Sequence, residues 1–187
     1  MTLGRLSSEE QYKGHDEILE VLADLADEIP DVSYLVCGDG DDRPRLERKA
    51  EQLGVADRTV FAGYVPEEEK EDHYRLADAF VMPGRGEGFG IVYLEAMACG
   101  VPVVASSADA SREAVHDGQL GVVVDPDDST DLRQGIHRAL DAERGVPDGL
   151  EHFSFDAFEE RWHQCFANVQ FPRITLCRFV THSTCHV

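Results

Sequence analysis

The sequence has few basic residues and no long apolar run. Its 187 residues include 17 Lys and Arg but 37 Asp and Glu, which gives a formal net charge of -20 and a pI near 4.6. No basic cluster offsets this charge, so the chain repels phosphate backbones and anionic lipid, and we expect no nucleic-acid partner. The longest apolar runs, such as residues 100–105, are far too short to span a membrane. No signal-peptide pattern opens the chain, and we expect a cytoplasmic protein without an integral membrane segment.

The sequence also lacks paired cysteines and is poor in lysine. Its five cysteines are odd in number and widely spaced, and none forms a Cys-x-x-Cys pair. We therefore expect reduced thiols and no zinc or redox motif built on such a pair. Lysine occurs only at positions 13, 49 and 70, beside 14 arginines. This excess of acid with little lysine indicates a salt-loving source, and an ordinary acidic cytosolic protein is the alternative.

Apolar runs of strand length alternate with segments of helical period along most of the chain. The expected strands are residues 32–37, 58–62, 79–82, 101–105 and 120–124. The expected helices are residues 16–29, 44–53, 67–76, 90–98, 130–142 and 155–169. Strands that are apolar throughout are buried on both faces, as in a parallel sheet covered by helices. The sequence therefore predicts an α/β fold with a single doubly wound, Rossmann-like parallel sheet.

The C-terminal end of the chain contains no acidic residues. All 37 lie within the first 169 residues, whereas residues 170–187 contain none. We expect residues 1–169 to form one domain and residues 170–187 a compositionally distinct, disordered tail. The tail residues Cys177, His182, Cys185 and His186 are of metal-binding type, but their spacing matches no common zinc finger. At the other end, only residues 2–3 are available for a strand before Gly4, so we expect a clipped first strand.

The segment 83–102 combines a glycine-rich turn with two carboxylates. It follows an expected strand and opens an expected helix, where backbone amides and the helix N-terminus suit a phosphate or an oxyanion. A tight turn without a ligand is the alternative. In a helix starting at Gly88, Glu87 and Glu95 would stand roughly 12 Å apart, too far for a glycosidase pair but suited to hydroxyls on an extended ligand. Periodicity alone also allows Glu95 to lie on a solvent face.

Residues 87–90 (EGFG) and 95–106 (EAMACGVPVVAS) resemble the E-x7-E signature of the family 4 retaining glycosyltransferases, the group 1 glycosyltransferases. The resemblance covers roughly residues 3–169. In family order it continues through residues 4–6 (GRL), 13–14 (KG), 36–40 (VCGDG), 60–66 (VFAGYVP), 77–79 (ADA) and 121–126 (GVVVDP). It implies the C-terminal, nucleotide-sugar-binding half of a two-domain GT-B fold.

The resemblance also implies roles for single residues. Arg5 and Lys13 would neutralise the donor diphosphate and stabilise the departing nucleotide, and Glu95 would bind the ribose hydroxyls. Glu87 would face the transferred sugar. The remaining implied contacts are backbone groups: those of Gly88, Phe89 and Gly90 near the sugar, and those of Gly38 and Val65 around the base. We expect neither a metal ion nor another cofactor, because the cations and the helix N-terminus take up the leaving-group charge.

Two departures from the family pattern affect the expected function. Gly84 stands where the family usually has Ser, and Asp109-Ala110 replace a Gly-Gly pair, which would place an acid beside the diphosphate. The resemblance also implies an N-terminal domain that would bind an acceptor carbohydrate or lipid, and we expect this chain to lack it. We therefore expect the donor-binding half of a retaining transferase, inactive by itself. The alternatives are a sugar-nucleotide epimerase of the same architecture and a catalytically silent nucleotide-binding module.

Overall fold

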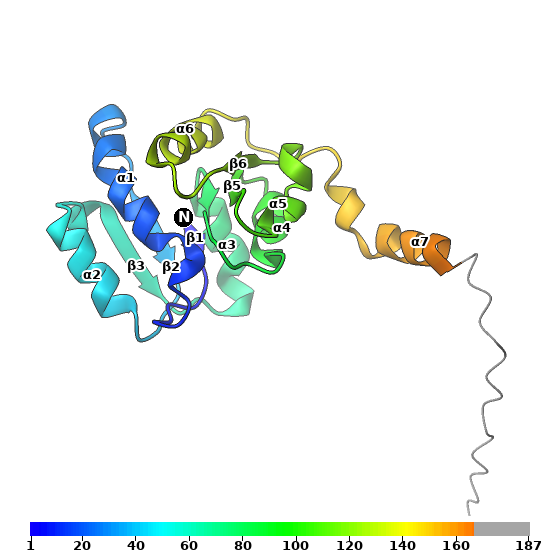
Figure 1. Ribbon diagram of the computed structural model, residues 1–187, viewed down its shortest axis with the longest axis horizontal. Coiled ribbons are helices and arrows are strands. Elements are labelled where there is room, and N and C mark those ends of the chain that lie inside the picture. Colours follow the sequence, from blue (N-terminus) through cyan, green and yellow to red (C-terminus); the bar gives the residue numbers. More distant parts are fainter. Residues whose placement is uncertain (167–187) are drawn as a thin grey trace, which may run out of the picture. The chain divides into compact units, whose positions relative to one another are not determined.

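The structure is a computed structural model that describes residues 1–166, divided into a compact unit, Met1–Leu150, and a second unit that follows it (Figure 1). The first unit contains six strands in two parallel three-stranded sheets. One sheet has the order β1 (Thr2–Leu3), β2 (Tyr34–Cys37), β3 (Thr59–Gly63), and the other β4 (Phe80–Val81), β5 (Val103–Ser106), β6 (Val122–Val124). The five apolar runs and the short first strand are thus confirmed as strands.

Hydrogen bonds at Met1 connect the two sheets. The Met1 amino group donates to the Ala79 carbonyl at 2.7 Å, and the Val81 amide donates to the Met1 carbonyl at 2.8 Å. This pair of bonds is the pattern of a parallel ladder, so the strands follow one another as β3-β2-β1-β4-β5-β6. The single sheet that the sequence predicts is interrupted at its centre because β1 and β4 have only two residues each. The order is that of a doubly wound fold.

The first unit contains six α-helices, five between successive strands and one after β6. They are α1 (His15–Glu28), α2 (Arg43–Gln52), α3 (Lys70–Leu76), α4 (Ile91–Ala98), α5 (Ser111–Ala114) and α6 (Ser129–Leu140). Short 3-10 turns cover Gln11–Lys13, Ala56–Arg58, Glu67–Glu69 and His116–Gly118. The helix expected to begin at residue 67 therefore starts with a 3-10 turn. The sequence did not predict α5, because one helical turn is too short to show an apolar period.

Two hydrophobic cores lie on the opposite faces of the strands. One contains apolar side chains of α1, α2 and α6, and the other contains those of α3, α4 and α5. Successive strand residues alternate between them: Val36 packs in the first core and Cys37 in the second, and Val104 and Val103 divide in the same way. This alternation explains why the strands are apolar throughout, and it confirms that helices cover both faces.

The second unit is described over residues 151–166 and contains helix α7 (Phe155–Phe166). The Arg161 guanidinium donates to the His152 carbonyl at 2.7 Å, and Phe158 stacks on Trp162 with ring centroids 6.3 Å apart. The expected tail 170–187, with its cysteines and histidines, lies outside the described residues. No helix in the described part of the chain is long and apolar enough to cross a membrane.

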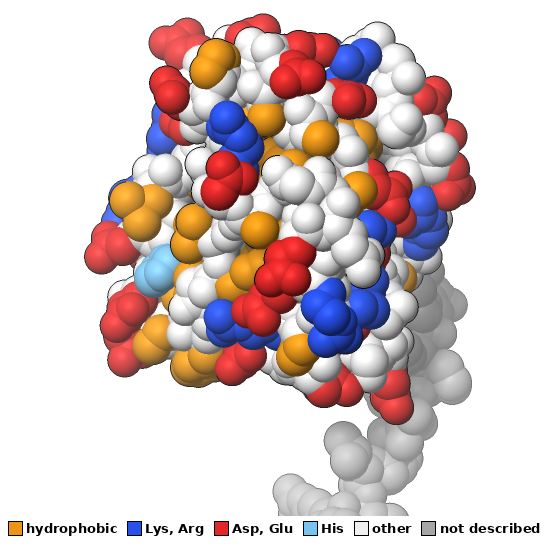
Figure 2. All heavy atoms as spheres, turned by 90° about the vertical axis from the view of Figure 1, so that its left-hand side faces the viewer, with side chains coloured by type: hydrophobic (Ala, Val, Ile, Leu, Met, Phe, Trp, Pro, Cys, Tyr) orange, Lys and Arg blue, Asp and Glu red, His pale blue; other side chains and the backbone are white. Residues whose placement is uncertain are grey.

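Charged side chains of both signs are spread over the surface. On the face that Figure 2 shows, Asp and Glu side chains are scattered across the whole surface, with Lys and Arg side chains between them. Many of these charges form ion pairs, such as Arg45 with Asp16 at 2.6 Å and Lys49 with Glu20 at 2.6 Å. Basic side chains on this face therefore form no continuous patch of the kind that binds a phosphate backbone.

Candidate functional site

The carboxyl ends of the parallel strands bring several predicted site residues to one edge of the molecule. Gly38 fixes this edge: a Cβ there would lie 1.8 Å from the Gly4 carbonyl oxygen, and its φ of 148° is unfavourable for other residues. The Gly38 amide donates to the Gly63 carbonyl at 2.8 Å. The backbone segments at the carboxyl ends of β1, β2 and β3 therefore lie in contact at Gly38. The close approach of Gly4 requires glycine at this position, which the sequence did not reveal.

The two predicted diphosphate cations lie side by side. Lys13 ends the turn before α1, and the Arg85 amide donates to the Tyr12 carbonyl at 2.8 Å, which holds this turn against the glycine-rich loop. The Lys13 side chain is largely buried, whereas that of Arg5 is 69% exposed. Both cations pair with Glu10: one carboxylate oxygen pairs with the Arg5 guanidinium, and the other lies 3.1 Å from the Lys13 Nζ. The structure thus brings the predicted cations together and adds an acid that sequence reasoning missed.

The glycines of the loop before α4 have different roles. Helix α4 begins at Ile91, one residue after the start of the expected helix 90–98, because Gly90 adopts a left-handed conformation with φ 82°. A Cβ on Gly90 would lie 2.5 Å from the ring of Tyr93, a fully buried side chain. Gly88 is exposed, and a Cβ there would meet no atom within 4 Å. The fold therefore requires glycine at position 90 but not at position 88.

Asp109 holds the backbone of Glu87. One Asp109 carboxylate oxygen accepts the Glu87 amide at 2.9 Å, and the other accepts the Ser111 amide at 3.0 Å. The Ala110 amide in turn donates to the Glu87 carbonyl at 3.2 Å. The sequence identified Asp109 only as an acid beside the diphosphate. In the structure its carboxylate accepts hydrogen bonds that fix the Glu87 backbone against the segment following β5, a contact between residues 22 positions apart in sequence.

Glu95 is half-buried in α4 and has a partner from α3. Its carboxylate accepts a hydrogen bond from the Tyr74 hydroxyl at 2.7 Å, and the Lys70 Nζ lies 3.8 Å from its other oxygen. Burial raises the pKa of Tyr74, so this hydroxyl stays protonated and donates. With an exposed fraction of 30%, the Glu95 side chain does not lie on a purely solvent face. The carboxylate is therefore held by Tyr74 and Lys70 and is still partly exposed.

The other predicted contacts lie in the same region. The Val65 side chain is buried in the second core, which also contains Cys37 and Tyr74, so only its backbone is suited to line a base pocket. Phe89 packs partly against this core. The Tyr64 ring next to Val65 is 77% exposed. Sequence reasoning included the Tyr64 position in a motif but gave it no role.

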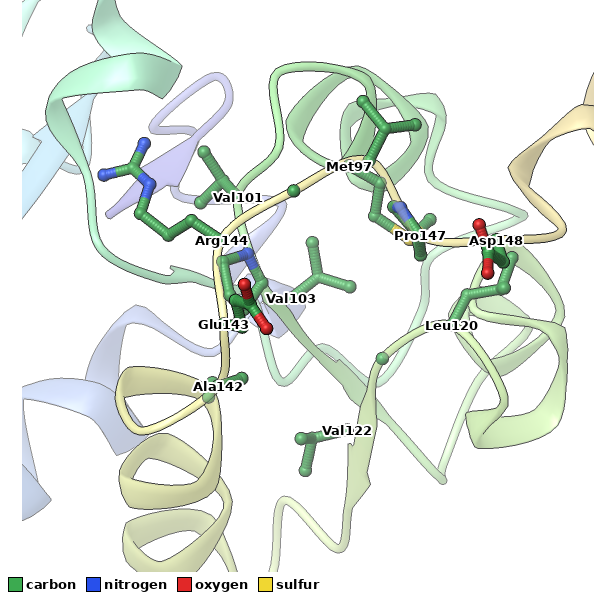
Figure 3. A pocket seen from close by; sticks show the side chains of 15 residues that line it. Met97, Val101, Val103, Leu120, Val122, Ala142, Glu143, Arg144, Pro147 and Asp148 are labelled. Carbon is green, nitrogen blue, oxygen red and sulfur yellow. The ribbon is translucent and has the colours of Figure 1, made fainter.

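A cavity on the first unit lies away from these residues. It has a volume of about 430 Å³ and is lined by residues preceding or beginning β5 and β6, such as Val103 and Leu120, and by the segment 142–148 (Figure 3). These strands begin at the opposite edge of the sheet from the glycine-rich loop. None of the predicted site residues lines this cavity. In the described part of the chain, no three His, Cys, Asp or Glu side chains are close enough to hold a metal ion.

Comparison with solved structures supports the fold. The sucrose-phosphate synthase of Thermosynechococcus elongatus is 27% identical with a TM-score of 0.72, over 90% of this chain and 45% of that one. The C-terminal domain of a glycosyl transferase group 1 family protein from Francisella tularensis is 28% identical with a TM-score of 0.63, over 75% of each chain. The expected GT-B, Rossmann-like fold is thereby confirmed.

Comparison of sequences leads to the family. A GDP-mannose-dependent alpha-(1-6)-phosphatidylinositol monomannoside mannosyltransferase of Mycolicibacterium smegmatis is 39% identical over 159 residues, which are 80% of this chain and 42% of that protein. The chain thus spans less than half the length of this relative. Residues 2–152 match the family model described as glycosyl transferases group 1. The sequence, the doubly wound sheet and these matches together show that the chain belongs to the group 1 glycosyl transferases.

Proposed function

We propose that the chain binds a nucleotide diphosphate sugar at the carboxyl edge of its sheet and forms the donor-binding half of a retaining glycosyltransferase. The observation that supports the proposal is that Arg5 and Lys13 pair with one acid in the turn held against the glycine-rich loop, and that this loop opens α4, the helix that contains Glu95. Ligands of doubly wound folds bind at this edge. The name of the Mycolicibacterium relative, a GDP-mannose-dependent enzyme, supports a nucleotide sugar as donor.

The proposed residue roles follow from charge and geometry. Arg5 and Lys13 neutralise the diphosphate and stabilise the charge that develops on the departing nucleotide. The α4 N-terminus adds partial positive charge, so the site uses no metal ion. Glu95, oriented by Tyr74, accepts hydrogen bonds from the ribose hydroxyls. Each of these groups acts on the nucleotide part of the donor.

The transferred sugar lies over the glycine-rich loop in this proposal. Glu87 faces the sugar, and Asp109 keeps the Glu87 backbone in position. The open space around Gly88 lets the amides of residues 88–90 approach a ligand without a side chain in between. The backbone of Gly38 and Val65 lines the base pocket. This arrangement leaves one face of the sugar open for an acceptor.

We propose that a separate N-terminal domain binds the acceptor, a carbohydrate or a lipid. The chain covers 42% of the Mycolicibacterium relative, whose name includes a phosphatidylinositol monomannoside, and it matches a solved C-terminal domain. Transfer requires donor and acceptor in a near-attack geometry, which can account for roughly 7 to 11 kcal/mol of a barrier. In this proposal the N-terminal domain forms the acceptor side of this arrangement.

A fusion tests the proposal. The N-terminal half of the Mycolicibacterium relative is joined to this chain and incubated with UDP-, GDP- and ADP-sugars and the acceptor named for that relative. Glycosylated acceptor with the donor's anomeric configuration, measured by mass spectrometry and NMR, is the expected result, and the Lys13→Ala fusion should lose it. Inverted product would contradict the retaining mechanism. An epimerised sugar nucleotide would identify an epimerase, and donor binding without product would identify a silent binding module.

A further inference from the structure

Glu10 lies between the two cations that the proposed function assigns to the diphosphate. One carboxylate oxygen of Glu10 pairs with the Arg5 guanidinium, and the other lies 3.1 Å from the Lys13 Nζ. These hydrogen bonds, first from Lys13 and then from Arg5, hold the pKa of Glu10 below its ordinary value, so the carboxylate is charged. A carboxylate that bridges two cations with its two oxygens occupies the position that phosphate oxygens would take.

The contacts of Glu10 also allow its side chain to leave this position. The residue stands before the turn Gln11–Lys13, and its side chain makes no capping hydrogen bond to the turn. Its backbone is fixed independently of the side chain, by a hydrogen bond from the Glu10 amide to the Ser7 carbonyl at 2.9 Å. The Glu10 side chain is partly exposed, and the Arg5 guanidinium is largely exposed. Rotation of the Glu10 side chain into solvent therefore breaks its two ion pairs but no capping hydrogen bond.

We propose that Glu10 is a built-in competitor for the diphosphate: it occupies Arg5 and Lys13 in the free protein, and a bound diphosphate displaces it. The inference rests on the proposed function of this edge. Displacement breaks two ion pairs before the ligand forms its own, so Glu10 weakens the binding of the donor and of the nucleotide diphosphate left after transfer. Glu10 therefore sets the affinity of the site and promotes nucleotide release.

Calorimetric titration of the 187-residue chain with inorganic pyrophosphate, UDP, GDP and ADP tests this role. Glu10→Gln removes the competing charge while keeping a side chain of the same size. We expect this variant to bind the preferred nucleotide diphosphate, and pyrophosphate, about 10-fold more tightly than the wild type, the equivalent of one charge-assisted hydrogen bond.

Glu9→Gln is the matched control. Glu9 is exposed in the same segment, and none of the ion pairs in the described part of the chain includes it, so its substitution makes the same charge change at a neighbouring position. We expect the affinity of this variant to stay within about twofold of the wild type, because exposed unpaired charges contribute little. Circular dichroism of each variant checks that the fold is intact.

Three results would overturn the inference. If Lys13→Ala weakens binding but Glu10→Gln binds as the wild type does or more weakly, Glu10 positions the cations and does not compete. If Glu9→Gln tightens binding as much as Glu10→Gln, the effect is one of net charge. If no variant binds pyrophosphate or any nucleotide, the proposed function itself fails, and the inference fails with it.

Discussion

Replacing single glycines of the loop before α4 should separate the requirements of the fold from those of the ligand. Gly90→Ala places a Cβ in a backbone with φ 82°, which costs roughly 1 to 2 kcal/mol for a residue other than glycine. The same Cβ would lie 2.5 Å from two ring carbons of Tyr93, and overpacking of this kind costs about 1 to 3 kcal/mol. We therefore expect Gly90→Ala to lower the free energy of unfolding by roughly 2 to 5 kcal/mol.

Gly88→Ala is the matched variant two residues away. Its Cβ meets no atom within 4 Å and its φ is not left-handed, so the free energy of unfolding should change by no more than about 0.5 kcal/mol. Its nucleotide diphosphate affinity should nevertheless fall if backbone amides of the loop contact the ligand. Urea unfolding followed by circular dichroism, together with calorimetry, measures both quantities. Equal destabilisation by the two variants would refute the reasoning, because it would mean that Gly88 is also packed.

Three further predictions concern pH, the Asp109 contact and activity. Burial lowers the pKa of His15 from 6.5 to about 4, so the unfolded chain binds more protons between these pH values. The free energy of unfolding should fall by roughly 3 kcal/mol as pH drops from about 6.5 to 4, and His15→Gln should flatten this slope in a series of urea titrations. Asp109→Ala should lower the free energy of unfolding by about 1 to 3 kcal/mol in urea titrations at pH 7, and Asp109→Asn should lower it by a smaller amount. The chain alone should show no transfer of radiolabelled sugar.

Most strands and helices were predictable because the apolar residues that form the core also show the spacing of a strand or a helix along the chain. The strands are apolar throughout because both faces are covered, and α1 shows a clear helical period with its inward side chains in the first core. The limits of β4 were less accurate: residues 79–82 were expected, and only Phe80–Val81 form ladder pairs. The expected start of α4, residue 90, was one residue early, because the left-handed conformation of Gly90 places it before the helix.

The sequence predicted only those site residues that belong to a motif along the chain. Arg5, Lys13, Glu87 and Glu95 belong to a motif that can be read along the chain. The contact between Glu87 and Asp109 joins two loops that only the folded sheet brings together. Glu10 was equally hidden, because no pattern indicates which acid in a chain with 37 of them pairs with a given cation.

The central claim, that a nucleotide diphosphate binds at the carboxyl edge of the sheet, is tested most directly by calorimetric titration of the chain and two variants. We expect UDP, GDP or ADP to bind at a single site. Lys13→Ala and Glu95→Gln should each weaken this binding by roughly 1 to 3 kcal/mol, the value of a charge-assisted hydrogen bond, with unchanged circular dichroism. Absence of binding by all three nucleotides, or unchanged affinity in both variants, would contradict the account.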